Sequence, residues 1–296
     1  MKLYILIIFF LYSFTCPLAA MDQERVYKGT EWNPIAYANG SKLPIASFVH
    51  FLQTNNIQIK GRKVLDVACG TGEITQHLAT EATHVHAIDA SENMVNHFSQ
   101  QISQKNLKNI STQHCCIENF LPTQLYNLAT LSSSYYWLEN PEQALKRIHN
   151  SLEINGEFFA NIETVSNNPL ITMAVVQDML NNLPLFSSTL SCYNISATST
   201  LPEKTKIKNL LEQTGFTLIT YDEQLFTCAI TKKEFEQMIY GITSSMPAIT
   251  YIPGFIVNIL SNSFIDRCLK KMDKINDTQY LYTYFTTIVH AVKNKL

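Results

Sequence analysis

The segment that most constrains this chain is residues 63–75, where a short apolar run meets two glycines. Residues 64–67 have the length and composition of a buried strand. The run breaks at Gly70 and Gly72, and apolar side chains then recur at helical spacing. Glycines let the backbone approach a ligand, and a helix N-terminus presents unpaired N–H groups with partial positive charge. The segment therefore predicts a strand, a tight turn and a helix that together form a polar ligand site.

A second strand end carries another acidic residue. The apolar run 84–88 ends in Asp89, seventeen residues after Gly72, about where a nucleotide-binding βαβ unit places an acid for ribose hydroxyls. Asp66 lies inside the first predicted strand, where a buried carboxylate needs a partner. A plain turn in which Asp66 caps a backbone N–H is the structural alternative. Thr75 occupies a position where the dinucleotide fingerprint requires Gly or Ala, so an NAD(P)-dependent oxidoreductase is only the second enzyme reading.

Strand-like and helix-like segments alternate along the chain, which predicts an α/β fold with a parallel sheet and helices on both faces. Ser91 and Pro141 suit the starts of two helices, and Gly215 suits the end of a third. The predicted strands are 63–67, 84–89, 110–116, 126–132, 157–163, 216–222 and 281–292, and the predicted helices are 44–52, 73–80, 91–104, 141–152 and 203–213.

Residues 66–72, with the sequence Asp-Val-Ala-Cys-Gly-Thr-Gly, resemble motif I of the class I S-adenosylmethionine-dependent methyltransferases. Residues 88–94, 126–138 and 151–158 are similar to the later motifs of that family. Residues 32–41 look like the N-terminal lid of trans-aconitate and juvenile-hormone-acid methyltransferases. The resemblance implies a Rossmann-like sheet of seven strands with an antiparallel final strand, and a helical cap over the substrate.

The resemblance also implies S-adenosyl-L-methionine as the cofactor and assigns it a set of residues. The backbone at Gly70 and Gly72 would pack against its methionine part, Asp66 would hold nearby backbone or its amino group, and Asp89 would accept from both ribose hydroxyls. Tyr136 and Trp137 would face the transferred methyl as the catalytic pair. The cofactor-binding residues implied are Tyr37, Asp66, Ala68, Gly70, Gly72, Asp89, Ala90, Met94, Cys116, Ile117, Ser132 and Ser133.

The charge pattern and the spacing of possible metal ligands limit the kinds of partner that this chain could bind. The net charge is −2, and the chain has no block of basic residues, so the electrostatic footprint of a nucleic-acid binder is missing. His84 and His86 alternate along one strand without a third ligand nearby, and we predict no metal site. The expected partner is a small-molecule acceptor. The sequence makes no prediction of oligomeric state.

The acceptor prediction rests on general-base chemistry. A carboxylate nucleophile needs no general base, whereas a hydroxyl or an amine often does, and no motif position carries a residue that must act as base. This pattern favours O-methylation of a carboxylate on a small organic or lipophilic acid, with a phenol as another acceptor; a catalytically silent cofactor-binding module is the non-enzymatic alternative. The apolar residues expected to receive the acceptor are Met173, Val176, Phe186, Met238, Ile239 and Met246.

Residues 1–20 have a charged start, an apolar run at 3–11 and small residues at the end, which is typical of a secretory leader. A translation start at Met21 would give a cytoplasmic enzyme, whereas a retained leader would anchor the chain through residues 3–18 and a cleaved one would export it. The remaining predicted divisions are a lid segment (21–55), a cofactor-binding core (56–166), a substrate-cap insertion (167–202) and a C-terminal half of the sheet (203–296) that includes a helical cap (231–278).

Overall fold

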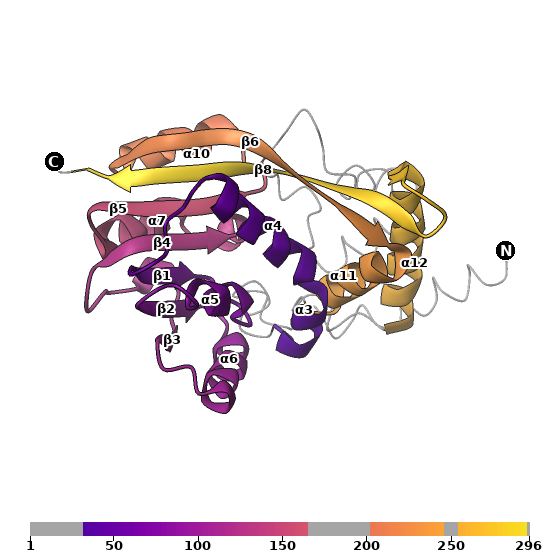
Figure 1. The fold of residues 1–296 in the computed structure, drawn as a ribbon, viewed down its shortest axis with the longest axis horizontal. Helices are drawn as coiled ribbons and strands as arrows, with labels where there is room; N and C mark the ends of the chain where they lie inside the picture. Colours follow the sequence, from indigo (N-terminus) through magenta and orange to yellow (C-terminus); the bar gives the residue numbers. More distant parts are fainter. Residues whose placement is uncertain (1–31, 165–201, 246–253, 295–296) are drawn as a thin grey trace, which may run out of the picture.

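The computed structural model describes residues 32–164, 202–245 and 254–294 (Figure 1). In this part of the chain one sheet of eight strands follows the order β3-β2-β1-β4-β5-β8-β6, with β7 paired to β8. The parallel strands are β1 (Lys63–Val67), β2 (His84–Asp89), β3 (Ile110–His114), β4 (Tyr126–Ser132) and β5 (Leu152–Ile162), and the others are β6 (Phe216–Thr231), β7 (Asp273–Lys274) and β8 (Gln279–Lys293).

The strand order reverses between β1 and β4, which are parallel neighbours. In open α/β sheets a ligand binds at such a switch point, beyond the carboxyl ends of the strands. These ends point toward α3 (Pro34–Gly40) and α11 (Lys232–Ser245) in Figure 1. The fold therefore places the ends of β1, β2, β4 and β5 together on one side of the molecule.

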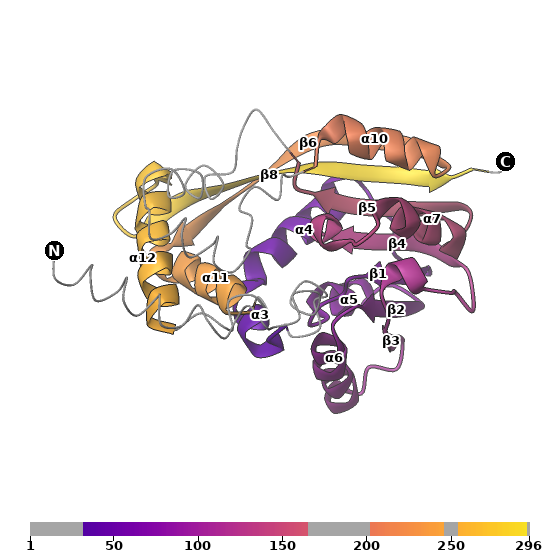
Figure 2. The same ribbon diagram turned by 180° about the vertical axis from the view of Figure 1, so that it is seen from behind.

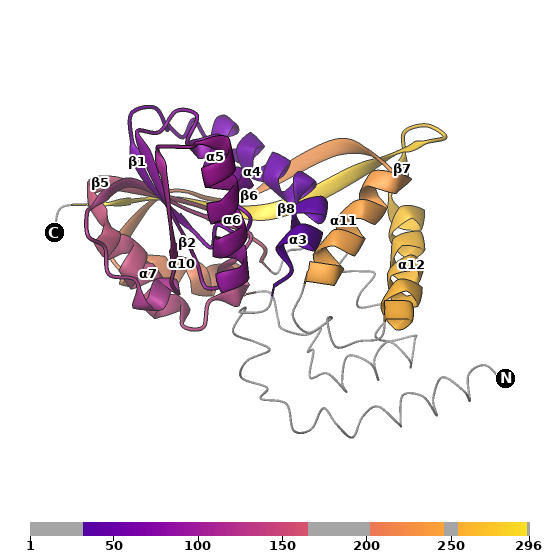
Figure 3. The same cartoon turned by 90° about the horizontal axis from the view of Figure 1, so that it is seen from below.

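Helices cover both faces of the sheet, as the alternating pattern predicts. Figure 3 shows α4 (Lys42–Thr54), α5 (Glu73–Leu78) and α6 (Glu92–Lys105) on one face. The opposite face carries α7 (Pro141–Ser151) and α10 (Lys204–Gln213), which are in front in Figure 2. Successive strand residues serve the two layers, since Val64 packs with Phe48 and Leu78 whereas Leu65 joins the cluster under α7 and α10.

The predicted helix ends are confirmed by local geometry. The Ser91 hydroxyl accepts from the Met94 N–H at the start of α6. Pro141 opens α7, and the Asn140 side chain caps that helix. Gly215 follows α10 with φ of +100°, a left-handed conformation that favours glycine.

Two predictions about the sheet are corrected. The sheet has eight strands rather than seven, because the two-residue strand β7 adds to the edge of β8. Strand β6 runs to Thr231 instead of ending at 222, since it pairs with β8 from Phe216↔Lys293 to Thr231↔Gln279, with one register shift between Leu218 and Thr220. As expected, β8 is antiparallel to β5.

The extended ends of β6 and β8 carry a helical subassembly beyond the sheet (Figure 1). It consists of α11 and α12 (Gly254–Lys271), within the predicted helical cap 231–278. Helix α3 packs closely on α11, because a Cβ on Gly241 would lie 2.4 Å from the Gly40 nitrogen. Met238 and Ile239, two of the residues expected to receive the acceptor, are buried in the α11–α12 core.

The predicted leader, the substrate-cap insertion beyond Thr164, and the residues Met173, Val176, Phe186 and Met246 lie outside the described residues. Within the described ranges, every helix is too short or too polar for a membrane crossing. No three His, Cys, Asp or Glu side chains of these ranges gather as a metal site would require.

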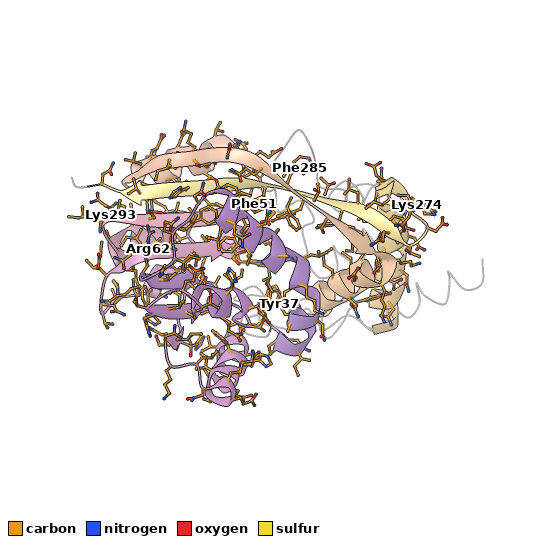
Figure 4. All side chains as sticks on the ribbon, viewed as in Figure 1. Tyr37, Phe51, Arg62, Lys274, Phe285 and Lys293 are labelled. Carbon is orange, nitrogen blue, oxygen red and sulfur yellow. The ribbon has the colours of Figure 1, made fainter. Side chains whose placement is uncertain are left out.

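A charged cluster joins the N-terminal end of β1 to β5 and β8. Glu157 on β5 accepts from Arg62 at 2.9 Å, and His290 of β8 lies 2.9 Å from its other oxygen. The hydrogen bond from His290, followed by that from Arg62, lowers the pKa of Glu157 to about 2 against the opposing effect of burial. In Figure 4, Arg62 lies at the end of the sheet away from Tyr37.

We expect Glu157→Gln to reduce stability most above pH 4.5 and progressively less as the pH falls toward 2. A carboxyl whose folded pKa is lowered contributes stability above its unfolded pKa, and this contribution is lost as the pH falls through the folded value. Allowing for solvent screening, the loss at neutral pH should be about 1–2 kcal/mol. Urea unfolding across pH measures it. Glu142→Gln, which removes only an exposed pair with Lys146, is the control, and equal losses in both variants would contradict the account.

Candidate active site

The turn from β1 to α5 is built from left-handed backbone. Gly70 has φ of +57° and Gly72 has φ of +84°, and Ala68 is also left-handed at +56°. The two glycines each leave room for a different aromatic ring. A Cβ on Gly70 would lie 3.4 Å from the ring of Tyr37, whereas one on Gly72 would lie 2.2 Å from the ring of Phe98. Gly70 thus faces Tyr37 at the strand ends, and Gly72 allows α6 to pack closely on the turn.

Asp89 ties this turn to the next one. One carboxylate oxygen accepts from the Gly70 N–H at 2.8 Å, and the other accepts from the Ser91 N–H at 2.8 Å. Burial raises its pKa, and the two N–H groups oppose that rise. A carboxylate has about four lone-pair positions, so each oxygen can still accept from a ligand hydroxyl. Ala90 lies between Asp89 and Ser91 in the chain, and its carbonyl oxygen is 3.0 Å from the His114 ring nitrogen.

Asp66 has two partners that the sequence did not predict. It is 2 % exposed and accepts from the hydroxyls of Thr75 at 2.6 Å and Thr130 at 2.7 Å. Burial raises its pKa to about 6, and the two hydroxyls act in the opposite direction. The carboxylate thereby fastens β1 to α5 and β4. The structure also explains why residue 75 is threonine rather than the Gly or Ala of the dinucleotide fingerprint, because its hydroxyl donates to the buried carboxylate of Asp66.

The residues predicted for adenine recognition differ in what they offer. Met94 is buried at the start of α6, and Ile117 is buried in the core under α7. Cys116 is half-buried and precedes the short helix η2 (Ile117–Asn119). The carboxylate of Glu118 accepts from the N–H groups of Glu139 and Asn140, so it supports the start of α7. Among these four residues the carboxylate of Glu118 is the strongest side-chain acceptor, because both N–H groups use its Oε1 and leave its Oε2 for an adenine amino group.

Aromatic side chains gather beside the turn. Trp32 packs edge-to-face on Trp137 with ring centroids 5.3 Å apart, and on Tyr37 at 6.1 Å. Tyr136 lies 5.2 Å from Trp137. Tyr136 and Trp137 belong to the short helix η3 (Tyr135–Trp137), and their exposed fractions are 46 % and 48 %. The predicted lid segment and the predicted catalytic pair thus meet in one aromatic wall, formed by Trp32, Tyr37, Tyr136 and Trp137. Figure 4 labels Tyr37, which comes from α3.

The ends of β4 and β5 hold a polar network. Ser133, which follows β4, has φ of +47° and receives support from Asn161, whose backbone and side-chain oxygens accept from the Ser133 N–H at 3.1 and 3.2 Å. The Asn161 amide also donates to the Ser133 hydroxyl at 2.9 Å and the Tyr284 hydroxyl at 3.2 Å. Non-glycine residues in left-handed backbone concentrate at functional sites. Ser132, the last residue of β4, pairs with Asn161 in the sheet.

Glu163 is the residue of this site that the sequence reasoning missed. It follows β5 directly, is 9 % exposed, and accepts a short hydrogen bond from the Tyr284 hydroxyl. Burial raises its pKa, and hydrogen bonds from the side chains of Tyr284 and Ser133 oppose that rise. The signal in the sequence was an acidic residue at the end of an apolar strand, the same pattern that marked Asp89.

The strand ends fit the predicted cofactor. Gly70 leaves open backbone beneath Tyr37, Asp89 keeps acceptor positions for a diol, and the aromatic wall suits a sulfonium cation. Tyr37 links these parts, because the charges of Glu73, Asp89 and Glu163 raise its pKa together with burial, which is the larger cause. The residues present at these strand ends therefore fit a cationic nucleoside.

Comparisons with known proteins agree with this geometry. The family described as "Methyltransferase domain" matches residues 59–239. A malonyl-[acyl-carrier protein] O-methyltransferase of Bacillus cereus is 28 % identical over 136 residues, covering 45 % of this chain and 49 % of that protein. A ubiquinone biosynthesis O-methyltransferase of Coxiella burnetii is 25 % identical over 171 residues, covering 55 % and 72 %. The matched part of this chain covers about half of the length of the malonyl-[acyl-carrier protein] O-methyltransferase, and less than half of two further curated relatives.

Solved structures share the fold at low identity. A candidate methyltransferase from Bacillus halodurans C-125 superposes with a TM-score of 0.55 at 14 % identity, over 84 % of this chain and all of that one. Phosphoethanolamine N-methyltransferase 2 of Haemonchus contortus, solved with S-adenosyl-L-methionine, has a TM-score of 0.57 at 14 % identity, over 93 % and 61 %.

These matches confirm the predicted Rossmann-like methyltransferase fold, and they confirm S-adenosyl-L-methionine as the cofactor at the level of the family. They also decide against the oxidoreductase alternative. The chain, with its glycine turn at the sheet's switch point, belongs to the methyltransferase domain family.

Proposed function

We propose that this chain transfers the methyl group of S-adenosyl-L-methionine to an oxygen atom of a small molecule. The observation that carries the proposal is the Asp89 clasp on Gly70 at the switch point, beside the aromatic wall. The two groups of relatives named above are both O-methyltransferases, which supports oxygen as the acceptor atom.

In this proposal the cofactor's nucleoside lies along the ends of β1 and β2. The lone pairs of Asp89 that the N–H groups of Gly70 and Ser91 leave free accept from the ribose hydroxyls. The left-handed turns at Ala68 and Ser133 expose backbone to its methionine part. Asp66 acts as a positioning residue, because its carboxylate holds Thr75 and Thr130 rather than facing outward.

The bound cofactor supplies an electrophilic methyl group on a positively charged sulfur. Trp137 and Tyr136 would attract that charge by a cation–π interaction of roughly 1–2 kcal/mol when water is excluded. Tyr37 and Trp32 would cover the site from α3 and exclude water. What remains for the protein is to align the acceptor oxygen with the methyl carbon.

Two classes of oxygen acceptor are candidates. The sequence favours a carboxylate, because its motif positions offer no residue that must act as base. A hydroxyl is the second candidate, and Glu163 is the specific observation in its favour, since it lies at the end of β5 with one carboxyl oxygen free of partners in the described residues. The insertion 167–202 remains the predicted source of further acceptor contacts.

The test is methyl transfer from S-adenosylmethionine with a tritiated methyl group to panels of small carboxylic acids, phenols, amines and RNA. We expect labelled product with an oxygen acceptor, either acid or phenol. Label transferred only to an amine or to RNA would contradict the proposal. Tight binding of S-adenosylhomocysteine without transfer to any panel would instead support the catalytically silent module.

A further inference from the structure

Glu163 presents an unusual buried carboxylate at the acceptor side of the site. Its Oε1 accepts from the Tyr284 hydroxyl, while its Oε2 is buried without a hydrogen-bond partner in the described part of the chain. A buried carboxylate oxygen that lacks a partner costs folding free energy. Such a group is retained where it serves a ligand, and unsatisfied buried groups call for an explanation of this kind.

The position of Glu163 relative to the cofactor site comes from its neighbours. Its charge raises the pKa of both Tyr37 and Tyr136, in each case after the larger effect of burial. The Tyr37 ring lies over Gly70, and Tyr136 belongs to the aromatic wall. Glu163 is therefore close to the aromatic side chains that would face the transferred methyl.

The carboxyl group is held in place by a network rather than by the strand alone. The Tyr284 hydroxyl contacts Ser133 and Asn161 at 3.2 Å each while it donates to Glu163. Since Ser133 is fixed in left-handed backbone by Asn161, the strand ends of β4 and β5 and the middle of β8 all orient this one carboxyl group. Orientation of this quality is what proton transfer between a base and a substrate demands.

We propose that Oε2 of Glu163 accepts the proton of an acceptor hydroxyl group, so that the acceptor is an alcohol or a phenol. The inference rests on the methyl transfer proposed above and names its substrate class. The acceptor O–H bond breaks with its electron pair on oxygen, and the proton passes to Oε2. The acceptor oxygen forms a bond to the methyl carbon while the carbon–sulfur bond breaks with its pair on sulfur. Glu163 then releases the proton to solvent.

This role fixes the pH dependence. Proton acceptance needs the ionised carboxylate, and burial raises the pKa of Glu163, so activity should rise with pH through that raised value. The titratable groups facing Glu163 are Tyr37 of α3, Tyr136 of η3, and Tyr282 and Tyr284 of β8, and the pKa of each is also raised. These tyrosines stay neutral in the working range. The raised pKa values of Asp66 and Asp89 act through the cofactor-binding turns, so at saturating cofactor the acidic limb of kcat reports Glu163.

The test compares Glu163→Gln with the wild type and with Glu139→Gln, an exposed control in the loop after η3. Gln keeps an oxygen for the Tyr284 hydroxyl but cannot accept a proton. We expect transfer to phenols to fall at least about 100-fold, the usual range for a general base, with loss of the acidic limb and unchanged affinity for S-adenosylhomocysteine in calorimetry. Tyr284→Phe should give a smaller loss and a shifted limb.

Several results would overturn the inference. Phenol methylation unaffected by Glu163→Gln would do so, as would turnover of carboxylic acids alone, or no turnover of any hydroxyl acceptor by wild type that binds S-adenosylhomocysteine. Failure to bind S-adenosylhomocysteine would instead reject the proposed function itself.

Stability provides a readout that is independent of turnover. A carboxyl with a raised folded pKa contributes stability below its unfolded pKa and loses it as the pH rises through the folded value. Glu163→Gln should therefore raise the melting temperature at pH 7–8 and leave it nearly unchanged near pH 4. A lowered melting temperature at pH 7–8 would show that Oε2 has a structural partner, which contradicts the proposal.

Discussion

Asp89→Ala should weaken S-adenosylhomocysteine binding by at least about 100-fold. The substitution removes the acceptors for the N–H groups of Gly70 and Ser91, so both turns lose a hydrogen bond to a charged group, each contributing about 1.5–3 kcal/mol. It also removes the proposed acceptors for the ribose hydroxyls. One lost charged hydrogen bond corresponds to about a tenfold change in affinity or more, and several are lost together.

Isothermal calorimetry of the folded variant measures this effect, with circular dichroism to show that the fold is retained. Asp222→Ala is the matched control, because Asp222 is an exposed aspartate on β6 whose side chain contacts only Gln224 among the described hydrogen bonds. We expect its affinity to equal that of the wild type. Wild-type affinity in Asp89→Ala would show that the clasp on Gly70 does not belong to the cofactor site.

Gly72→Ala should destabilise the fold by about 3 kcal/mol or more. The added Cβ would lie 2.2 Å from the Phe98 ring, and φ at this position is +84°. A side chain in left-handed backbone costs roughly 1–2 kcal/mol, and overpacking a buried contact costs typically 1–3 kcal/mol more. Phe98 is fully buried on α6, so it cannot move aside into solvent.

Gly61→Ala separates the two causes, because Gly61 has φ of +77° but no atom within 4 Å of the added Cβ. We expect it to cost only about 1–2 kcal/mol, the backbone part alone. Urea unfolding of both variants gives the comparison. Equal losses at the two glycines would mean that the contact between Gly72 and Phe98 contributes nothing, contrary to the packing described here.

The strands, the helix and the turn around Gly70 follow from patterns that are local in the sequence. The apolar runs 64–67 and 84–88, the glycine turn and the cap at Ser91 each specify their own conformation, and the chain's alternation then limits the sheet topology. The same locality explains Asp89, since its partners Gly70 and Ser91 are in adjacent turns of one βαβ unit. These parts of the site could be predicted, because short-range backbone geometry determines them.

The features that the sequence did not reveal depend on contacts between distant residues. Glu163 is held by Tyr284, 121 positions later in the chain, and Trp32 meets Trp137 only after the lid folds over the sheet. The partners of Asp66 are distant in the same way, because Thr130 comes from β4, 64 positions away. The extra length of β6 depends on its pairing with β8. No local sequence pattern specifies which other strand a given strand will pair with in the sheet.

The measurement that tests the account most directly is calorimetry of the wild-type protein with S-adenosylhomocysteine, compared with NADH under the same conditions. The account predicts one-site binding of S-adenosylhomocysteine with a Kd well below about 1 mM, which corresponds to more than about 4 kcal/mol, and no binding of NADH. No heat with S-adenosylhomocysteine at millimolar concentration, or binding of NADH in its place, would contradict it.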